Sequence, residues 1–192
     1  MLQCTMRIFR LSLVLAFVAI ASCRSGHTSA PAAPRPTASA DVPSDHYYAG
    51  TSIMTMGGRH VGETKVLAKR TLDPSSSTIT EEVVSEDGRS GKASVYVVVM
   101  AVNGATFTMT EASGAFEGKG TLSGAPWQWT SWESTSTMPD GGLVTSKDSL
   151  TTDGLRVTKT YAGQGIEVFF EETFQEVRKE EYELAKKTML AK

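Results

Sequence analysis

The 192-residue sequence predicts an all-β domain: about ten antiparallel strands in an up-and-down meander, followed by one C-terminal helix. Two observations support this prediction. Turn markers recur at short intervals between residues 47 and 174, and apolar and polar residues alternate between them. A sheet of so many twisted strands tends to curl or to close on itself. We therefore expect a barrel or a curved half-barrel, with a two-sheet sandwich as the alternative.

The turn markers combine glycine or proline with short polar residues. Asn-Gly and Asp-Gly pairs supply the positive φ angles that tight hairpin turns need. Successive markers lie about 10 to 17 residues apart, which leaves room for one strand and for no crossover helix. The markers are Gly57-Gly58, Asp73-Pro74, Asp87-Gly88, Asn103-Gly104, Ser113-Gly114, Ser123-Gly124-Ala125-Pro126, Asp140-Gly141-Gly142, Asp153-Gly154 and Gly163-Gln164-Gly165.

The segments between the markers have strand character. In Thr106–Thr110, Phe107 and Met109 share one face, and in the segment from Ile166 onward, Phe170 lies on an apolar face. Such alternation is typical of antiparallel strands with one buried and one solvated face. Val95–Val102 is apolar on both faces, so we expect a cover on each side, with the C-terminal helix as the outer one.

The last segment, Glu176–Leu190, changes from strand to helix composition. It is rich in helix formers, and Lys179→Glu183 and Glu183→Lys187 are opposite charges four residues apart. The sequence therefore predicts one amphipathic or largely exposed terminal helix.

The N-terminus has the pattern of an export signal. Arg7 and Arg10 precede an apolar run of 12 residues, Leu11–Ser22. As a helix this run spans roughly 18 Å, which is too short for a hydrocarbon core of about 30 Å. We therefore interpret residues 1–22 as a cleaved signal peptide rather than a transmembrane helix.

The residues around the expected cleavage point, Ile20-Ala21-Ser22-Cys23, resemble the lipobox of bacterial lipoproteins. This resemblance implies a lipid on Cys23, cleavage before it and attachment to a membrane; two or three acyl chains hold a protein stably. Arg24, rather than Asp, follows the cysteine, which resembles outer-membrane lipoproteins and implies a periplasmic or surface-exposed domain. The alternative is an ordinary secretory signal that ends at Ala19-Ile20-Ala21.

Residues 23–44 form the expected tether between the lipid and the domain. They are mainly Ala, Pro, Ser and Thr, and prolines recur at 31, 34, 36 and 43. Such a segment buries too little apolar surface to offset its chain entropy. The domain itself is expected to span residues 45–192.

The strand order, the size and the terminal helix resemble those of the lipocalin-like, or calycin, group of exported β-barrels. The sequence lacks the N-terminal Gly-x-Trp motif of lipocalins. The stretch Gly118–Trp132 also resembles small uncharacterised bacterial envelope domains, a likeness that implies no activity.

An aromatic cluster is the clearest candidate for a ligand site. All three tryptophans fall within six positions, and strict alternation places Trp127 and Trp129 on one face and Trp132 on the other. Indole rings supply large apolar contact area and one donor. We expect the ligand-binding residues to be Trp127, Trp129, Phe107, Met109 and Phe170; packing of the tryptophans in the core is the alternative.

The sequence lacks the residues that several other classes of functional site require. The formal charge is −2, or −4 once the leader is removed, and a weakly acidic domain lacks the basic stripe that nucleic-acid binding needs. Loss of Cys4 and lipidation of Cys23 would leave no thiol for a disulfide, a metal or a nucleophile. Asp45, His46 and His60 lack metal-ligand spacing, so no metal or cofactor is expected.

Catalytic motifs are weak as well. Gly120–Gly124 has its serine one position late for a nucleophile elbow. In the pairs Glu81-Glu82 and Glu171-Glu172, neighbouring residues of a strand point to opposite faces and cannot act together. A lone inward Glu81 or Glu172 would instead be a candidate for a ligand contact or a tuned acid, the alternative being a solvated face.

The sequence therefore predicts a non-enzymatic, lipid-anchored barrel that binds a small apolar or amphipathic ligand in its interior. The second hypothesis is an interaction module that docks another envelope protein, and the third is an uncharacterised hydrolase. A filled interior would contradict the first hypothesis. An exposed apolar patch that includes Val98 and Met100 would favour the second.

Overall fold

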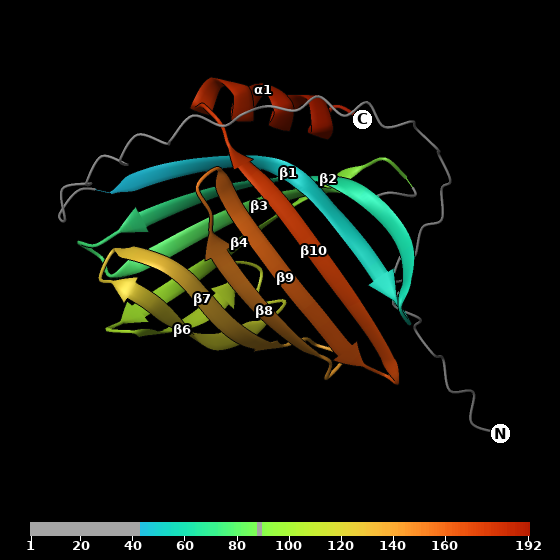
Figure 1. The fold of residues 1–192 in the computed structure, drawn as a ribbon, viewed down its shortest axis with the longest axis horizontal. Helices are drawn as coiled ribbons and strands as arrows, with labels where there is room; N and C mark the ends of the chain where they lie inside the picture. Colours follow the sequence, from blue (N-terminus) through green and yellow to red (C-terminus); the bar gives the residue numbers. More distant parts are fainter. Residues whose placement is uncertain (1–42, 88–89) are drawn as a thin grey trace.

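The computed structural model describes residues 43–87 and 90–192, which form a closed antiparallel barrel of ten strands with one helix outside it (Figure 1). This confirms the predicted fold class and is consistent with a lipocalin-like fold. The strands are β1 (Ser44–Met56), β2 (Arg59–Asp73), β3 (Thr78–Glu86), β4 (Ala93–Asn103), β5 (Thr106–Glu111), β6 (Glu117–Ala125), β7 (Gln128–Thr137), β8 (Leu143–Leu150), β9 (Gly154–Gly163) and β10 (Ile166–Glu176), and the helix is α1 (Lys179–Leu190).

Closure comes from the pairing of the first strand with the last. β1 pairs with β10 from Tyr48↔Glu176 to Met56↔Val168, and every other strand pairs with its neighbours in the chain. The sandwich alternative is therefore wrong. Closure leaves no unpaired edge strand, which removes the surface on which other chains could add a strand.

The expected turn markers lie at the connections between consecutive strands. Gly57-Gly58 joins β1 to β2, Asn103-Gly104 joins β4 to β5, and Gly163-Gln164-Gly165 ends β9 and leads into β10. Gly57, Gly104 and Gly165 all have positive φ, as tight turns require. Asp87 begins the β3–β4 connection, whose residues 88 and 89 lie outside the described part of the chain.

Because the strands alternate in direction, the connections divide between two ends of the barrel. We call the end that holds the β1–β2, β3–β4, β5–β6, β7–β8 and β9–β10 connections the open end. We call the opposite end, where β1 begins and β10 finishes, the closed end. Apolar side chains fill the closed end; they include Leu72, Ile79, Val102, Leu122, Trp127, Trp129 and Leu150.

A β-bulge in β7 changes the predicted placement of the tryptophans. Ser123 pairs with Ser131 but Gly124 pairs with Trp129, so Thr130 is an extra residue. Trp129 and Trp132 consequently both lie in one buried cluster, 6% and 7% exposed. The expectation that they occupy opposite faces is wrong, because strict alternation does not hold across a bulge.

The helix covers the outside of the barrel over β1 to β3 (Figure 1). Tyr182, which is fully buried, and Met189 pack against Tyr47, Leu67 and Val84 on the outer strand faces. The Tyr47 and Tyr182 rings lie 5.4 Å apart. The outer side of β4 receives less cover than the sequence predicts, since Val95 and Val99 are 43% and 40% exposed.

The helix begins three residues later than expected. The Val177 amide donates to the Tyr47 carbonyl at 2.8 Å, which extends the contact between the chain's last strand and β1. The Glu181 carboxylate then accepts a hydrogen bond from the Arg178 amide at 3.0 Å and caps the new helix. The acidic first turn, with Glu180 and Glu181, also suits the positive end of the helix dipole.

The described residues contain no helix that is long and apolar enough to cross a membrane. The predicted signal peptide (1–22), the predicted lipidation site Cys23 and the predicted tether up to residue 42 lie outside the described residues. The tether was expected to reach residue 44, but Ser44 already belongs to β1.

Candidate ligand-binding cavity

Two cavities lie inside the barrel at the open end, and Tyr96 of β4 lines both. The larger has a volume of about 520 Å³ and the smaller about 270 Å³. The larger lies in the size range of small-molecule sites, and the smaller just below it. The interior of the barrel is therefore not filled at this end.

The larger cavity has a mainly apolar wall contributed by β4 to β8. Its apolar and aromatic lining side chains are Tyr96, Val98, Met100, Phe107, Met109, Ala115, Phe116, Trp132, Met138 and Val144. Phe116 and Met138 belong to the connections at the open end, so the wall reaches the mouth of the barrel. Three methionines in the wall can adjust to ligands of different shape.

Glycines on the inner face of β6 make room for two of these side chains. A Cβ atom on Gly120 would lie 2.3 Å from Phe107 Cζ, and one on Gly118 would lie 2.7 Å from Met109 Cε. Phe107 and Met109 therefore rest against bare backbone. The space that side chains at positions 118 and 120 would fill is instead occupied by Met109 and Phe107 of the cavity wall.

A buried ion cluster stands at the deep wall of the larger cavity. Arg70 of β2 donates from Nε to Glu81 Oε2 at 2.8 Å and from Nη2 to Asp148 Oδ2 at 2.9 Å. The Ser146 hydroxyl donates to the other oxygen of Asp148 at 2.9 Å. Arg70 is 2% exposed and Asp148 6%, so both charges are removed from water. Such charges are tolerated only when paired and hydrogen-bonded.

Burial raises the pKa of Asp148; Arg70 opposes this shift and the neighbouring Glu81 carboxylate adds to it. Two carboxylates thus share one guanidinium. Trp132 lies over the same guanidinium, with Arg70 Cζ 4.0 Å from the ring centroid. Arg70 Nη1 is the single buried side-chain nitrogen or oxygen in the described part of the chain that has no hydrogen-bond partner.

A second ion pair separates the two cavities. Lys159 Nζ of β9 lies 2.9 Å from Glu172 Oε2 of β10, and Ser52 donates to Glu172 Oε1 at 3.4 Å. Burial acts to lower the pKa of Lys159, but the neighbouring Glu172 carboxylate, 2.9 Å away, and Glu81 favour its charged form and the pKa is raised. Burial raises the pKa of Tyr96, so its phenol is neutral. Lys159 is therefore a charged side chain with its partners already in place.

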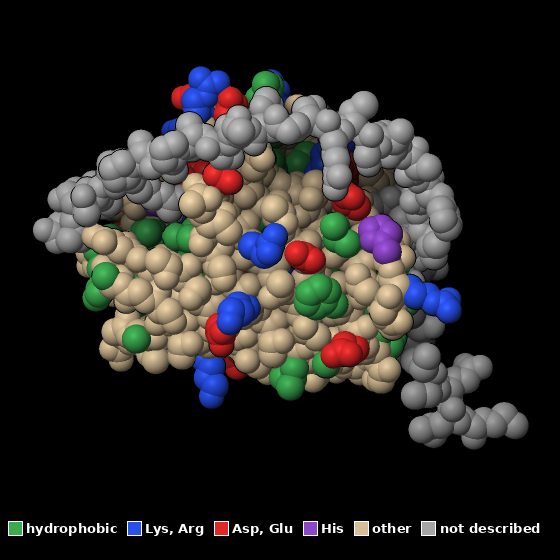
Figure 2. Space-filling model, in the orientation of Figure 1, with side chains coloured by type: hydrophobic (Ala, Val, Ile, Leu, Met, Phe, Trp, Pro, Cys, Tyr) green, Lys and Arg blue, Asp and Glu red, His purple; other side chains and the backbone are tan. Residues whose placement is uncertain are grey.

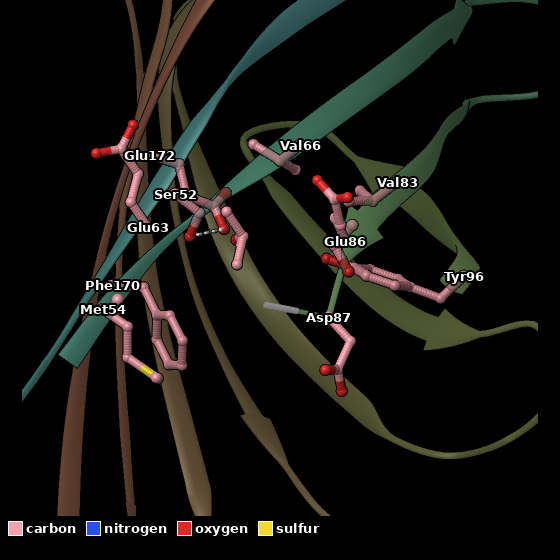
Figure 3. Close-up of a pocket in the computed structure, with 13 residues that line it drawn as sticks. Ser52, Met54, Glu63, Val66, Val83, Glu86, Asp87, Tyr96, Phe170 and Glu172 are labelled. Carbon is pink, nitrogen blue, oxygen red and sulfur yellow. Dashed lines mark hydrogen bonds between the residues drawn. The ribbon is translucent and has the colours of Figure 1, made fainter. Parts of the chain in front are cut away.

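The smaller cavity has a mixed apolar and acidic lining. Figure 3 shows Met54 and Phe170 on one side of it, Tyr96 on the other, and the Ser52–Glu172 hydrogen bond between them. Asp87 and Glu172 are acidic residues of its lining; Glu63 and Glu86 also border it, but Glu63 is exposed on the outer face of β2 and Glu86 pairs with Lys192 outside the barrel. No lysine or arginine belongs to its described lining.

The predicted ligand residues fall in three places. Phe107 and Met109 line the larger cavity, and Phe170 lines the smaller one. Trp127 and Trp129 lie in neither; their rings pack at the closed end with centroids 4.8 Å apart and planes tilted by 54°. Trp127 has a φ of 59°, an unfavourable angle for a large residue, and its packing on Trp129 helps to hold it there. The core-packing alternative therefore describes these two tryptophans.

The charged residues of the deep wall come from distant parts of the sequence. Glu81 and Glu172 point inward, one of the two orientations that the sequence allows, while Glu82 and Glu171 point outward to Lys186 and Arg156. Asp148 and Lys159 were not foreseen. Their positions within alternating strands, at the same parity as Leu150 and Val157, were the available signal.

The histidines lie apart. His46 is near the start of β1 at the closed end, where its Nδ1 is 3.1 Å from Glu176 Oε1. His60 is exposed near the start of β2, at the open end. Within residues 43–87 and 90–192, no group of three His, Cys, Asp or Glu side chains is placed to hold a metal ion.

The outer surface is polar where the interior is apolar. Figure 2, in the orientation of Figure 1, shows charged side chains of both signs and scattered hydrophobic ones on the face of the barrel turned toward the viewer. Val98 and Met100, which would have marked an outer docking patch, point inward and are each 6% exposed. No family model matches this chain, and no curated protein matches it.

Proposed function

We propose that this protein is a lipid-anchored, non-catalytic envelope protein that binds one small amphipathic molecule in its barrel. The observation that carries the proposal is the cavity of about 520 Å³, apolar along its wall and charged at its deep end. Pockets of this size, mainly apolar with a few fixed polar groups, are typical of sites for small molecules.

Apolar and charged side chains lie on different parts of the cavity wall, which supports an amphipathic rather than a purely apolar ligand. Phe107, Met109 and Phe116 offer apolar contact from the β5 and β6 side. Glu81, Asp148 and Lys159 offer polar contact from the opposite, deep side. An apolar body would gain about 25 cal/mol per Å² of buried surface, and its polar group would have partners at the ion cluster.

The anchoring part of the proposal rests on the lipobox-like Ile20-Ala21-Ser22-Cys23. Because β1 begins at the closed end, an anchor on Cys23 would be joined to the barrel at that end. The ligand entrance would then lie at the opposite end from the attachment point. Mass spectrometry of the N-terminal peptide from membrane fractions tests this part: we expect a diacylglyceryl group on Cys23 and none in Cys23→Ser.

The binding part is tested with N-phenyl-1-naphthylamine, a neutral probe whose fluorescence rises in apolar surroundings. The purified Cys23→Ser protein in detergent-free buffer should bind one probe per chain, and decanol should displace it. Ser134→Phe places a ring at an inward position of the larger cavity and should abolish binding. Thr135→Phe, at the neighbouring outward and exposed position, is the matched control and should bind normally.

Native mass spectrometry of the same two variants adds an unbiased readout. An extra mass that is released on denaturation, and that Ser134→Phe lacks while Thr135→Phe retains it, would identify the natural ligand. Equal probe binding in both variants, with both folded by circular dichroism, would contradict the cavity as the site.

A further inference from the structure

The charge of the cavity walls is strongly one-sided. Three acidic side chains line the larger cavity, namely Glu81, Glu111 and Asp148, and Asp87 and Glu172 belong to the lining of the smaller. Lys159 is the one basic side chain in the described lining of either. Walls of a single sign concentrate ligands of the opposite sign at the mouth of a cleft.

The buried ion cluster also contains more acidic than basic side chains. Arg70 and Lys159 face three buried or nearly buried carboxylates, those of Glu81, Asp148 and Glu172. Lys159 and Glu172 form one pair, at 2.9 Å. Arg70 serves both Glu81 and Asp148, so one carboxylate remains without a cation of its own.

Asp148 is the carboxylate that carries this excess. Its partners are the shared Arg70 Nη2 and the neutral Ser146 hydroxyl, and it lines the larger cavity. Asp148 is only 6% exposed, and an uncompensated charge at such a buried position is costly. A second positive charge that arrives from the cavity would complete the cluster.

Aromatic side chains stand around the same space, which is an independent observation. Trp132, Tyr96, Phe107 and Phe116 all line the larger cavity. Ring faces attract cations, and aromatic walls combined with a carboxylate are the usual chemistry for binding protonated amines. Trp132 already makes such a contact with Arg70 at 4.0 Å.

We infer that the ligand of this barrel is a cationic amphiphile, whose protonated amine lies against Asp148 while its apolar body fills the larger cavity. This inference rests on the proposed function and specifies its ligand class. Lys159 does not reverse the preference, because Glu172 and Tyr96 already surround it. Arg70, whose Nη1 lacks a partner, lines neither cavity.

Three probes of equal chain length test the inference: decylamine, decanol and decanoate. Each is titrated into the Cys23→Ser protein loaded with N-phenyl-1-naphthylamine, and its dissociation constant is obtained from displacement. We expect decylamine to bind about tenfold tighter than decanol, as one desolvated charge-assisted contact would give, with decanoate weakest. Asp148→Asn should bring decylamine to the affinity of decanol and leave decanol unchanged.

Glu133→Gln is the matched control, since this carboxylate on β7 faces solvent and pairs with Lys147 outside the barrel. It should leave all three dissociation constants unchanged. Decanol binding equal to or tighter than decylamine, or decanoate binding tightest, would overturn the amine inference and leave the binding function intact. Failure of all three probes to bind would overturn the proposed function itself. The wild-type ranking decides between these outcomes even if Asp148→Asn does not fold.

Discussion

Arg70 Cζ lies 4.0 Å from the centre of the Trp132 ring, so that a guanidinium from β2 is stacked on an indole from β7 across the barrel interior. The same guanidinium binds Glu81 and Asp148. One side chain thus joins four strands of a closed sheet. The cluster it organises forms the deep wall of the larger cavity.

We expect Arg70→Ala to lower the free energy of unfolding by about 3–5 kcal/mol, because it leaves two carboxylates buried without their cation. Urea denaturation measures the change. Arg156→Ala is the control: its pair with Glu171 spans 4.0 Å and is largely exposed, so its loss should cost under about 1 kcal/mol. Equal effects of the two substitutions would show that the interior cluster does not stabilise the fold.

Gly120→Ala should destabilise the barrel by about 1–3 kcal/mol, since the added Cβ would lie 2.2 Å from the Glu133 carbonyl oxygen and 2.3 Å from Phe107 Cζ. Thermal unfolding followed by circular dichroism measures the loss. The neighbouring Lys119 points outward and is exposed, and Lys119→Ala should change stability by less than about 0.5 kcal/mol. An unchanged melting temperature in Gly120→Ala would mean that Phe107 does not rest on this backbone.

The contact between α1 and the barrel should depend on Tyr182, which is fully buried and donates a hydrogen bond to Glu82 at 2.8 Å. We expect Tyr182→Ala to cost about 3–5 kcal/mol through the lost packing. Tyr182→Phe should cost only about 1 kcal/mol, because it loses the hydrogen bond alone. Leu184→Ala, at a position 68% exposed, serves as the control in the same urea titration and should be nearly neutral.

Binding of decylamine should weaken on acidification at a pH above the usual range of an aspartate. Burial raises the pKa of Asp148, opposed by Arg70 and reinforced by Glu81; Lys159 also opposes it from β9, and Ser146 donates to it. As the pH falls through this raised value, the carboxylate takes up a proton and loses its attraction for the ammonium. Decanol binding should stay constant, and so should both ligands in Asp148→Asn.

The pH dependence of the free energy of unfolding distinguishes this loss of decylamine binding from unfolding of the protein. A carboxyl whose pKa is higher in the folded state is protonated more readily when folded, so acidification between the two pKa values favours the fold at this site. A loss of decylamine binding in this pH range, with an unfolding midpoint that does not fall, would therefore report on Asp148. Parallel loss of decanol binding would contradict this assignment.

Local signals in the sequence determined the strands of this protein. Pairs such as Asn103-Gly104 mark tight turns because a glycine such as Gly104 adopts the positive φ that the turn needs. Phe107 and Met109 share a face because strand side chains alternate. These are properties of near neighbours, so the strand count, the meander and the inward direction of both side chains followed from reading along the chain. The start of α1 was less well placed, because the contact of Val177 with Tyr47 joins residues 130 positions apart.

Only the tertiary structure decided which inward residues plug the barrel and which line a cavity. The extra residue Thr130 turns Trp132 inward, a change of register that appears only when β7 is paired with β6. Arg70 meets Asp148 across 78 positions of the chain because closure brings their strands around one interior. Charge pairing and cavity volume depend on distances between strands, and those distances are set by the number and stagger of strands in the closed sheet rather than by any single segment.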